Sequence, residues 1–245
     1  FYERDLAISE KILGTEHPDT AISLNNLGTL LQATNDLETA RSYLERALTI
    51  REKALGSDDP ETAQSFNNLG ALLEAMGDLA AARPFYERAL ATYEKTLGSD
   101  HPETARTLNN LGGLLQSMDN LPSAKSFFER SLAIREQALG SDHPETAQSL
   151  NNLGALLEAM GDFVAARPFY ERALAIYKKV LGPDHPETAL GLNNLAILAY
   201  NEEDYREAAR LMRQALAIRE NRLGADHPDT IDSRESLSDI EAELS

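Results

Sequence analysis

Small and apolar residues recur along this chain at the spacing of one helix face, and the series stops and restarts at regular places. Ala147, Leu150, Leu153 and Leu157 lie three or four positions apart, which keeps their side chains on one face of an amphipathic helix. The series breaks at Gly161-Asp162, as expected where one helix ends and a capping residue begins the next. A second series follows at Ala166, Phe169, Tyr170, Ala173, Leu174, Tyr177 and Leu181. The pattern predicts two antiparallel helices of about 16 and 19 residues joined by a tight turn.

This two-helix pattern recurs at a fixed interval, marked by a proline followed by an acidic residue and a threonine. The marker prolines are 42 residues apart: Pro18, Pro60, Pro102, Pro144, Pro186 and Pro228. A period of this length is typical of stacked two-helix units, each of which contacts only its neighbours. The sequence therefore predicts an all-α chain with breaks near residues 35, 77, 119, 161 and 203 and near 57, 99, 141, 183 and 225.

On this register the chain is a single array of about twelve helices. An unpaired second helix occupies residues 1–14, and a terminal capping helix, in which Arg234 replaces an apolar residue, occupies residues 225–245. Five complete repeats lie between them, at residues 15–56, 57–98, 99–140, 141–182 and 183–224. Residues 61–104 and 145–188 differ at only seven of 44 positions, so the array also repeats at twice the unit length. Because Phe1 falls inside a unit, we expect the chain to be part of a longer array.

Two local features describe how each unit begins and how it packs. Asp142 is suited to cap a first helix, Pro144 suits its first turn, and Glu145 completes a capping box. A small residue lies in the middle of every complete unit's first helix: Gly28, Gly70, Gly112, Gly154 and Ala196. Helices packed in tandem need a close backbone approach, which glycine and alanine permit.

The repeating strings identify a family resemblance. Leu-x-x-Leu-Gly, then Gly-Asp, then an alanine ahead of an aromatic residue and Ala-Leu, is similar to the tetratricopeptide repeat. The usual unit has about 34 residues, whereas the longer unit here, with its Asn-Asn-Leu and Arg-Ala-Leu strings, resembles the repeats of kinesin light chain and related bacterial arrays. The resemblance covers essentially the whole chain. It implies a right-handed superhelical solenoid whose first helices line a concave groove, in a non-catalytic protein-interaction scaffold.

Composition restricts the partners. The chain has a net charge of −17 and a pI near 4.7, which repels nucleic acid and anionic membrane surfaces. It has no cysteine, so it has no disulfide framework, thiol nucleophile or cysteine metal site, and it suits a reducing compartment such as the cytoplasm. Its apolar runs are far shorter than the roughly 18 residues of a membrane span.

The histidines are the first candidates for chemistry. They stand at one position of the unit: His17, His101, His143, His185 and His227. Metal ligands must converge on one ion, and equivalent positions of a solenoid do not converge. Asp59 occupies the same position in the remaining unit, which favours a helix-capping role. The sequence also carries no phosphate loop, zinc-hydrolase helix or nucleophile elbow. We therefore expect no catalytic residue, no cofactor and no metal.

The paired asparagines are the strongest functional candidates. They are Asn25-Asn26, Asn67-Asn68, Asn109-Asn110, Asn151-Asn152 and Asn193-Asn194. Asparagine is unfavourable inside a helix by several tenths of a kcal/mol relative to alanine, so its recurrence needs a reason. One asparagine of each pair would bond a neighbouring helix or turn, or the side-chain amides would bond a peptide backbone in the groove. We favour the first asparagine of each pair for the groove.

At the lining positions that the resemblance implies, the groove is rich in amides, small in the middle and nearly neutral. The candidate contact residues are Asn25, Gln32, Gln64, Asn67, Glu74, Arg106, Asn109, Gln116, Gln148, Asn151, Glu158, Asn193 and Tyr200. The lysine and arginine sets with which similar carboxylate-clamp repeats hold an acidic C-terminus are missing. We therefore expect a protein or peptide partner that is not strongly acidic, held as an extended peptide or as a helix.

Two other classes of function remain open from the sequence. The array is also suited to a structural spacer or a rod that associates end to end, because the first helix has lost its partner and leaves Leu6, Ile8 and Leu13 incompletely covered. A sensor arm that regulates an effector domain outside this sequence is the third reading, and it is common among similar bacterial arrays.

Overall fold

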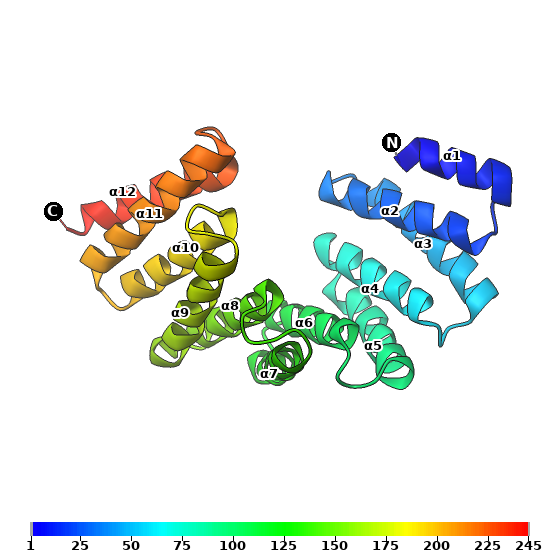
Figure 1. The fold of residues 1–245 in the computed structure, drawn as a ribbon, viewed down its shortest axis with the longest axis horizontal. Helices are drawn as coiled ribbons and strands as arrows, with labels where there is room; N and C mark the ends of the chain where they lie inside the picture. Colours follow the sequence, from blue (N-terminus) through cyan, green and yellow to red (C-terminus); the bar gives the residue numbers. More distant parts are fainter. Residues whose placement is uncertain (1, 245) are drawn as a thin grey trace. The chain divides into compact units, whose positions relative to one another are not determined.

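The computed structural model describes residues 2–244, and its helices follow the 42-residue register (Figure 1). The first helices of the units begin at the marker prolines: α2 (Pro18–Ala33), α4 (Pro60–Ala75), α6 (Pro102–Ser117), α8 (Pro144–Ala159), α10 (Pro186–Asn201) and α12 (Pro228–Ala242). The second helices are α1 (Tyr2–Leu13), α3 (Leu37–Leu55), α5 (Leu79–Thr96), α7 (Leu121–Ala138), α9 (Phe163–Val180) and α11 (Tyr205–Leu223). Among the described residues there are twelve helices and no strand, so the predicted all-α repeat fold and its breaks are confirmed.

The chain forms two compact units, Phe1–Ile134 and Arg135–Ser245, and α7 contributes residues to both. In the first unit, α2 packs against α1 and α3, and α4 packs against α3 and α5. In the second unit, α10 packs against α9 and α11, and α12 packs against α11. First helices also contact one another, α2 with α4, α4 with α6, and α8 with α10. First helices of each unit therefore lie beside one another, and the candidate groove residues lie on these helices.

Each first helix is capped by the residue directly before its proline. The capping residues are His17, Asp59, His101, His143, His185 and His227, whose side chains each accept a hydrogen bond from the backbone N–H two residues later. In the fourth unit, Nδ1 of His143 accepts from the N–H of Glu145 at 3.2 Å. The expected capping role of the histidines is confirmed. Within residues 2–244, no three His, Asp or Glu side chains are placed to hold a metal ion.

The prediction that Asp142 caps this helix is wrong. Asp142 lies one residue too early, and its carboxylate instead accepts a hydrogen bond from Lys179 at 2.7 Å. The capping box is wrong for the same reason. With His143 as the cap, Glu145 contributes its backbone N–H, and its carboxylate lies 3.6 Å from Arg135.

The first helices need a small residue at this position, because an aromatic or leucine side chain of the following second helix packs against it. A Cβ added at Gly70 would lie 2.9 Å from the ring of Tyr86, and one added at Gly154 would lie 2.7 Å from the ring of Tyr170. Such distances are too short for non-bonded carbon atoms. The predicted close approach of the paired helices is confirmed, because these side chains pack directly on the helix backbone.

The two terminal helices present different surfaces. On α1, Leu6 is buried, whereas Ile8 is 57% exposed and Leu13 is 42% exposed. On α12, Arg234 is exposed and pairs with Glu220 at 2.9 Å, as expected of a polar last helix. Within the described part of the chain, no helix has the length and apolar character that crossing a lipid bilayer requires.

Candidate functional site

A hollow between α2 and α4 brings asparagine and glutamine side chains together in the first unit. Its volume is about 430 Å³. It is lined by Tyr2, Asn25, Asn26, Thr29, Leu30, Ala33, Gln64 and Asn68, and we call it the amide hollow. Half of these side chains are amides, each of which carries both hydrogen-bond donors and an acceptor. The hollow is therefore equipped to bind polar groups of either kind.

Two asparagines of the hollow, Asn25 and Asn68, are hydrogen-bonded to each other. Nδ2 of Asn68 donates to Oδ1 of Asn25 at 2.8 Å, which ties α4 to α2. Asn25 is only 6% exposed, whereas Asn26 beside it is exposed. Neighbouring residues of a helix point about 100° apart, so one asparagine of the pair is enclosed while the other reaches the hollow.

The same division holds in two further pairs. Asn67 is 1% exposed, and its Nδ2 donates to Oγ1 of Thr107 at 2.9 Å, which ties α4 to α6. Asn151 is 6% exposed, and Asn152 beside it is half-buried. In this arrangement the first asparagine of these pairs is enclosed by helices, which is the alternative role considered above. The more accessible amide is the second one.

Asn67→Ala is expected to lower the free energy of unfolding by about 1 kcal/mol, because it removes a buried hydrogen bond and gains only a small improvement in helix propensity. The matched variant Asn26→Ala removes an exposed amide from the equivalent region of α2. It is expected to leave stability unchanged or to raise it by about 0.5 kcal/mol. Urea unfolding followed by circular dichroism compares the two variants. Equal stability of the two would show that the bond between Asn67 and Thr107 contributes nothing.

Two glutamates of the candidate groove accept hydrogen bonds from tyrosines of their own repeats. The hydroxyl of Tyr86 donates to Glu74 at 3.0 Å, and the hydroxyl of Tyr170 donates to Glu158 at 2.8 Å. Burial raises the pKa of Glu74 above its ordinary value, and the hydrogen bond from Tyr86 partly opposes that shift. Glu158 also accepts from Nδ2 of Asn201 at 2.8 Å. Both carboxylates therefore connect the two helices of their repeat, and Glu158 also connects α8 to α10 of the next repeat.

Arg106, the cation among the candidates, is also engaged. Its Nε donates to Oε2 of Glu103 at 2.9 Å, and both side chains are half-buried on α6. This pairing, one turn apart on the helix, neutralises the charge of Arg106 at the surface. Arg106 therefore does not offer an unpaired positive charge to a ligand.

Three candidate amides accept hydrogen bonds from arginines of the second helices. Nη1 of Arg51 lies 3.2 Å from Oε1 of Gln64, and Nη1 of Arg135 lies 3.5 Å from Oε1 of Gln148. Nη1 of Arg219 donates to Oδ1 of Asn193 at 3.2 Å. Each amide oxygen uses one of its two lone pairs in this way, so the NH₂ group and one acceptor position remain for a ligand.

The remaining candidates lie on α2, α6 and α10. Gln32, Gln116 and Asn109 are half-buried. Tyr200 packs edge-on against Tyr205, with ring centroids 5.3 Å apart. Tyr200 also lines a second hollow, which belongs to the second unit.

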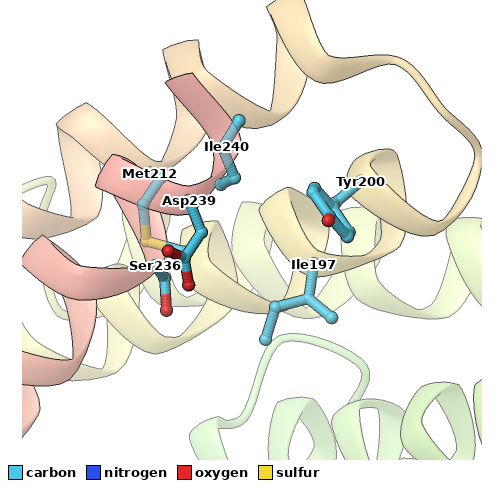
Figure 2. A pocket seen from close by; sticks show the side chains of 6 residues that line it. All are labelled: Ile197, Tyr200, Met212, Ser236, Asp239 and Ile240. Carbon is cyan, nitrogen blue, oxygen red and sulfur yellow. The ribbon is translucent and has the colours of Figure 1, made fainter. Parts of the chain in front are cut away.

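This second hollow lies among α10, α11 and α12 and has a volume of about 200 Å³. It is lined by Ile197, Tyr200, Met212, Ser236, Asp239 and Ile240, and we call it the C-terminal hollow (Figure 2). Figure 2 shows Ile197 and Tyr200 on one side and Ser236 and Asp239 on the other. Its walls are mainly apolar, with one carboxylate at the edge.

Some residues of the two hollows were missed by the sequence reasoning. In the amide hollow they include Asn26 and Asn68, whose presence in the pairs was visible but whose exposure was not. In the C-terminal hollow they include Met212, Ser236 and Asp239, which come from elements outside the predicted lining. A comparison of each residue with its equivalents one unit earlier would have flagged all three, because each differs from them.

The chemistry of the amide hollow suits binding. Amide side chains form hydrogen bonds without taking up or releasing a proton at neutral pH. Proton transfer in catalysis needs a group whose pKa is close to the working pH. Among the residues that line this hollow, the only titratable side chain is that of Tyr2.

Comparison with protein families gives one model, described as tetratricopeptide repeat. It matches six overlapping stretches of the chain: residues 1–53, 28–95, 61–137, 103–179, 145–221 and 192–245. Together these matches extend over the whole sequence. A comparison with curated proteins gives no match.

Solved structures with the same fold come from several organisms. One is a Podosopora anserina protein assigned as a kinesin light chain, with nearly identical TPR-like repeats. It is 27% identical to this chain with a TM-score of 0.70, and the match covers 84% of this chain and 97% of that chain. BtubC (BKLC) from P. vanneervenii is 22% identical with a TM-score of 0.76, over 93% of this chain and 94% of that chain. PilF from Pseudomonas aeruginosa is 21% identical with a TM-score of 0.60, and the match covers 93% of this chain and 91% of that chain. The last two show likeness of fold alone.

Proposed function

Because this chain belongs to the tetratricopeptide-repeat family, we propose that it is a protein-interaction scaffold that holds a segment of a partner protein against its first helices. Repeats of this family are generally non-catalytic scaffolds. The observation that carries the proposal is the amide hollow, in which four amide side chains surround an open space between two first helices.

The chemistry of the hollow favours an extended segment. An extended backbone has N–H and C=O groups without internal partners, and these must be bonded when the segment leaves water. Asn26 and Gln64 offer accessible amide groups at the hollow. Leu30 and Ala33 supply apolar surface beside them. Such a surface holds a main chain with little regard to its sequence, and selectivity then comes from side-chain sites elsewhere on the first helices.

Charge gives a second constraint on the partner. The net charge of −17 disfavours a strongly acidic segment. Arg106, which would otherwise attract a carboxylate, is paired with Glu103. The proposed partner segment is therefore neutral or basic.

The test begins with selection of random 12-residue peptides displayed on phage against the immobilised protein. A selected peptide is then synthesised and titrated against the parent and against Asn26→Ala/Gln64→Ala. Loss of two hydrogen bonds is expected to weaken binding about tenfold or more. The matched control is Gln137→Ala, an exposed amide on a second helix, which is expected to bind like the parent. Failure to enrich any peptide, or equal binding by the double variant, would overturn the proposal.

A further inference from the structure

The C-terminal hollow occurs where the last two units depart from the repeat. Its lining residue Met212 stands where the three preceding units have Tyr170, Phe128 and Tyr86. Ser236 stands where the other first helices have the second asparagine of the pair. A thioether chain replaces an aromatic ring and a hydroxymethyl group replaces an amide, so both positions carry smaller side chains than in the preceding units.

The same departures change the chemistry of the walls. In the preceding unit the hydroxyl of Tyr170 donates to Glu158 at 2.8 Å. The equivalent residues here are Met212 and Tyr200, so the carboxylate is replaced by an aromatic ring. Ile197 and Ile240 complete the apolar lining. The hollow therefore combines aliphatic walls with one aromatic side chain.

The electrostatic environment favours a cation. Asp239 is the one residue with a formal charge at neutral pH among the six that line the hollow, and it is exposed. Helix α12 carries five acidic residues and a single basic one. The arginines nearest in sequence to the lining residues are already paired, Arg213 with Glu241 at 2.6 Å and Arg234 with Glu220 at 2.9 Å. Within residues 2–244, no basic side chain is paired with Asp239.

We propose that the C-terminal hollow receives an arginine side chain of the partner segment, with the aliphatic stem against the exposed Ile197, above the buried Met212 and Ile240, and the guanidinium on Asp239. This inference rests on the proposed function and adds to it a preferred residue of the partner. Tyr200 offers a ring against which a guanidinium stacks, and Ser236 offers a hydroxyl oxygen as a further acceptor. Arginine fits better than lysine because its planar group pairs with a carboxylate through two hydrogen bonds and stacks on aromatic rings.

The size of the hollow agrees with a single side chain. Sites for drug-sized ligands usually enclose about 300–1,000 Å³, whereas this hollow has about 200 Å³. Its lining includes residues of α10 and α12, the first helices at the end of the second unit, so a segment held against the first helices of that unit would reach it. An apolar residue would fill the walls but leave the Asp239 carboxylate without a partner.

The test uses protein with labelled isoleucine and methionine methyl groups and a defined probe, the capped peptide acetyl-Ala-Ala-Arg-Ala-Ala-amide. Two analogues carry citrulline or glutamate in place of arginine; citrulline keeps the shape and removes the charge. NMR titration follows the methyl resonances of Ile197, Met212 and Ile240 together with the side-chain amides of Asn26 and Asn68. The arginine peptide is expected to shift the three methyl resonances and to bind about tenfold more tightly than the citrulline analogue. The glutamate analogue is expected not to bind there.

Two matched variants distinguish a direct contact with Asp239 from the general effect of the negative charge of α12. Asp239→Asn is expected to weaken binding of the arginine peptide about tenfold, as measured by the shifts of the three methyl resonances. Glu235→Gln removes the same charge from an exposed position of α12 outside the hollow. This variant is expected to bind within about twofold of the parent, because a charge that does not touch the peptide acts on it only through screening solvent.

Three results would overturn the inference: no shift of the three methyl resonances, equal binding of arginine and citrulline peptides, or equal effects of the two variants. If the amides of Asn26 and Asn68 shift while the three methyl resonances do not, the proposed function stands and the arginine site is wrong. If neither set shifts with this probe and the phage selection also fails, both proposals are wrong.

Discussion

Arg51→Ala is expected to lower the free energy of unfolding by about 3 kcal/mol, since it removes a buried charged group together with the hydrogen bonds that this group donates. The Arg51 side chain is 2% exposed. Its Nη1 donates to the backbone oxygen of Glu61 at 2.8 Å and to Oγ of Ser65 at 2.9 Å. The alanine variant would leave a cavity between α3 and α4 and three polar atoms, those of Glu61, Gln64 and Ser65, without this donor.

The measurement is urea unfolding followed by circular dichroism, with Arg41→Ala as the matched control on the same helix. Arg41 is exposed and pairs with Glu45 one turn away, so its loss is expected to cost less than about 0.5 kcal/mol. Arg51→Met retains most of the buried stem and should fall between the two, which separates lost volume from lost hydrogen bonds. If Arg51→Ala were as stable as Arg41→Ala, the buried arginine would not connect the repeats.

This arginine belongs to the longer period of the array. Arg135 donates to Ser149 at 2.8 Å as Arg51 does to Ser65, and Arg219 donates to Ser233. In the alternate units the same position is occupied by a buried tyrosine, Tyr93 and Tyr177. Burial raises the pKa of each tyrosine to about 12. Successive units are therefore joined alternately by a charged and by a neutral side chain.

Two adjacent glycines are expected to respond to alanine with opposite signs. A Cβ added at Gly112 would lie 2.7 Å from ring atoms of Phe128, whereas nothing lies within 4 Å of one added at Gly113. Gly112→Ala should therefore push the ring out of its place and cost about 2 kcal/mol, as overpacked cores do. Gly113→Ala should stabilise α6 by about 0.5–1 kcal/mol, because glycine is the poorer helix former.

The same unfolding measurement on the two variants tests this prediction, with the parent between them. Both changes add one methyl group to the same helix, so differences in composition and propensity cancel. A stabilising effect of Gly112→Ala would mean that Phe128 moves aside at no cost, and that the small residue of the unit is not needed for packing.

The helix register was predictable from the chain because local rules determine it. Pro144 and the residues around it start a helix wherever the rest of the protein lies, and Gly161-Asp162 ends one helix and starts the next. The fixed interval between such signals then fixes the number and order of helices. The capping residue was missed by one position, since both Asp142 and His143 carry a suitable acceptor and only the backbone geometry distinguishes them.

The role of the asparagines was decided by the tertiary structure. Asn67 and Asn68 are the same residue type on the same helix, and the helical period does not say which of them a neighbouring helix will cover. The position of α6 encloses Asn67 and bonds it to Thr107, and the position of α2 bonds Asn68 to Asn25. The C-terminal hollow likewise depends on how α10, α11 and α12 meet. Local sequence determines where helices begin and end, whereas burial and open space depend on side chains from separate helices that only packing brings together.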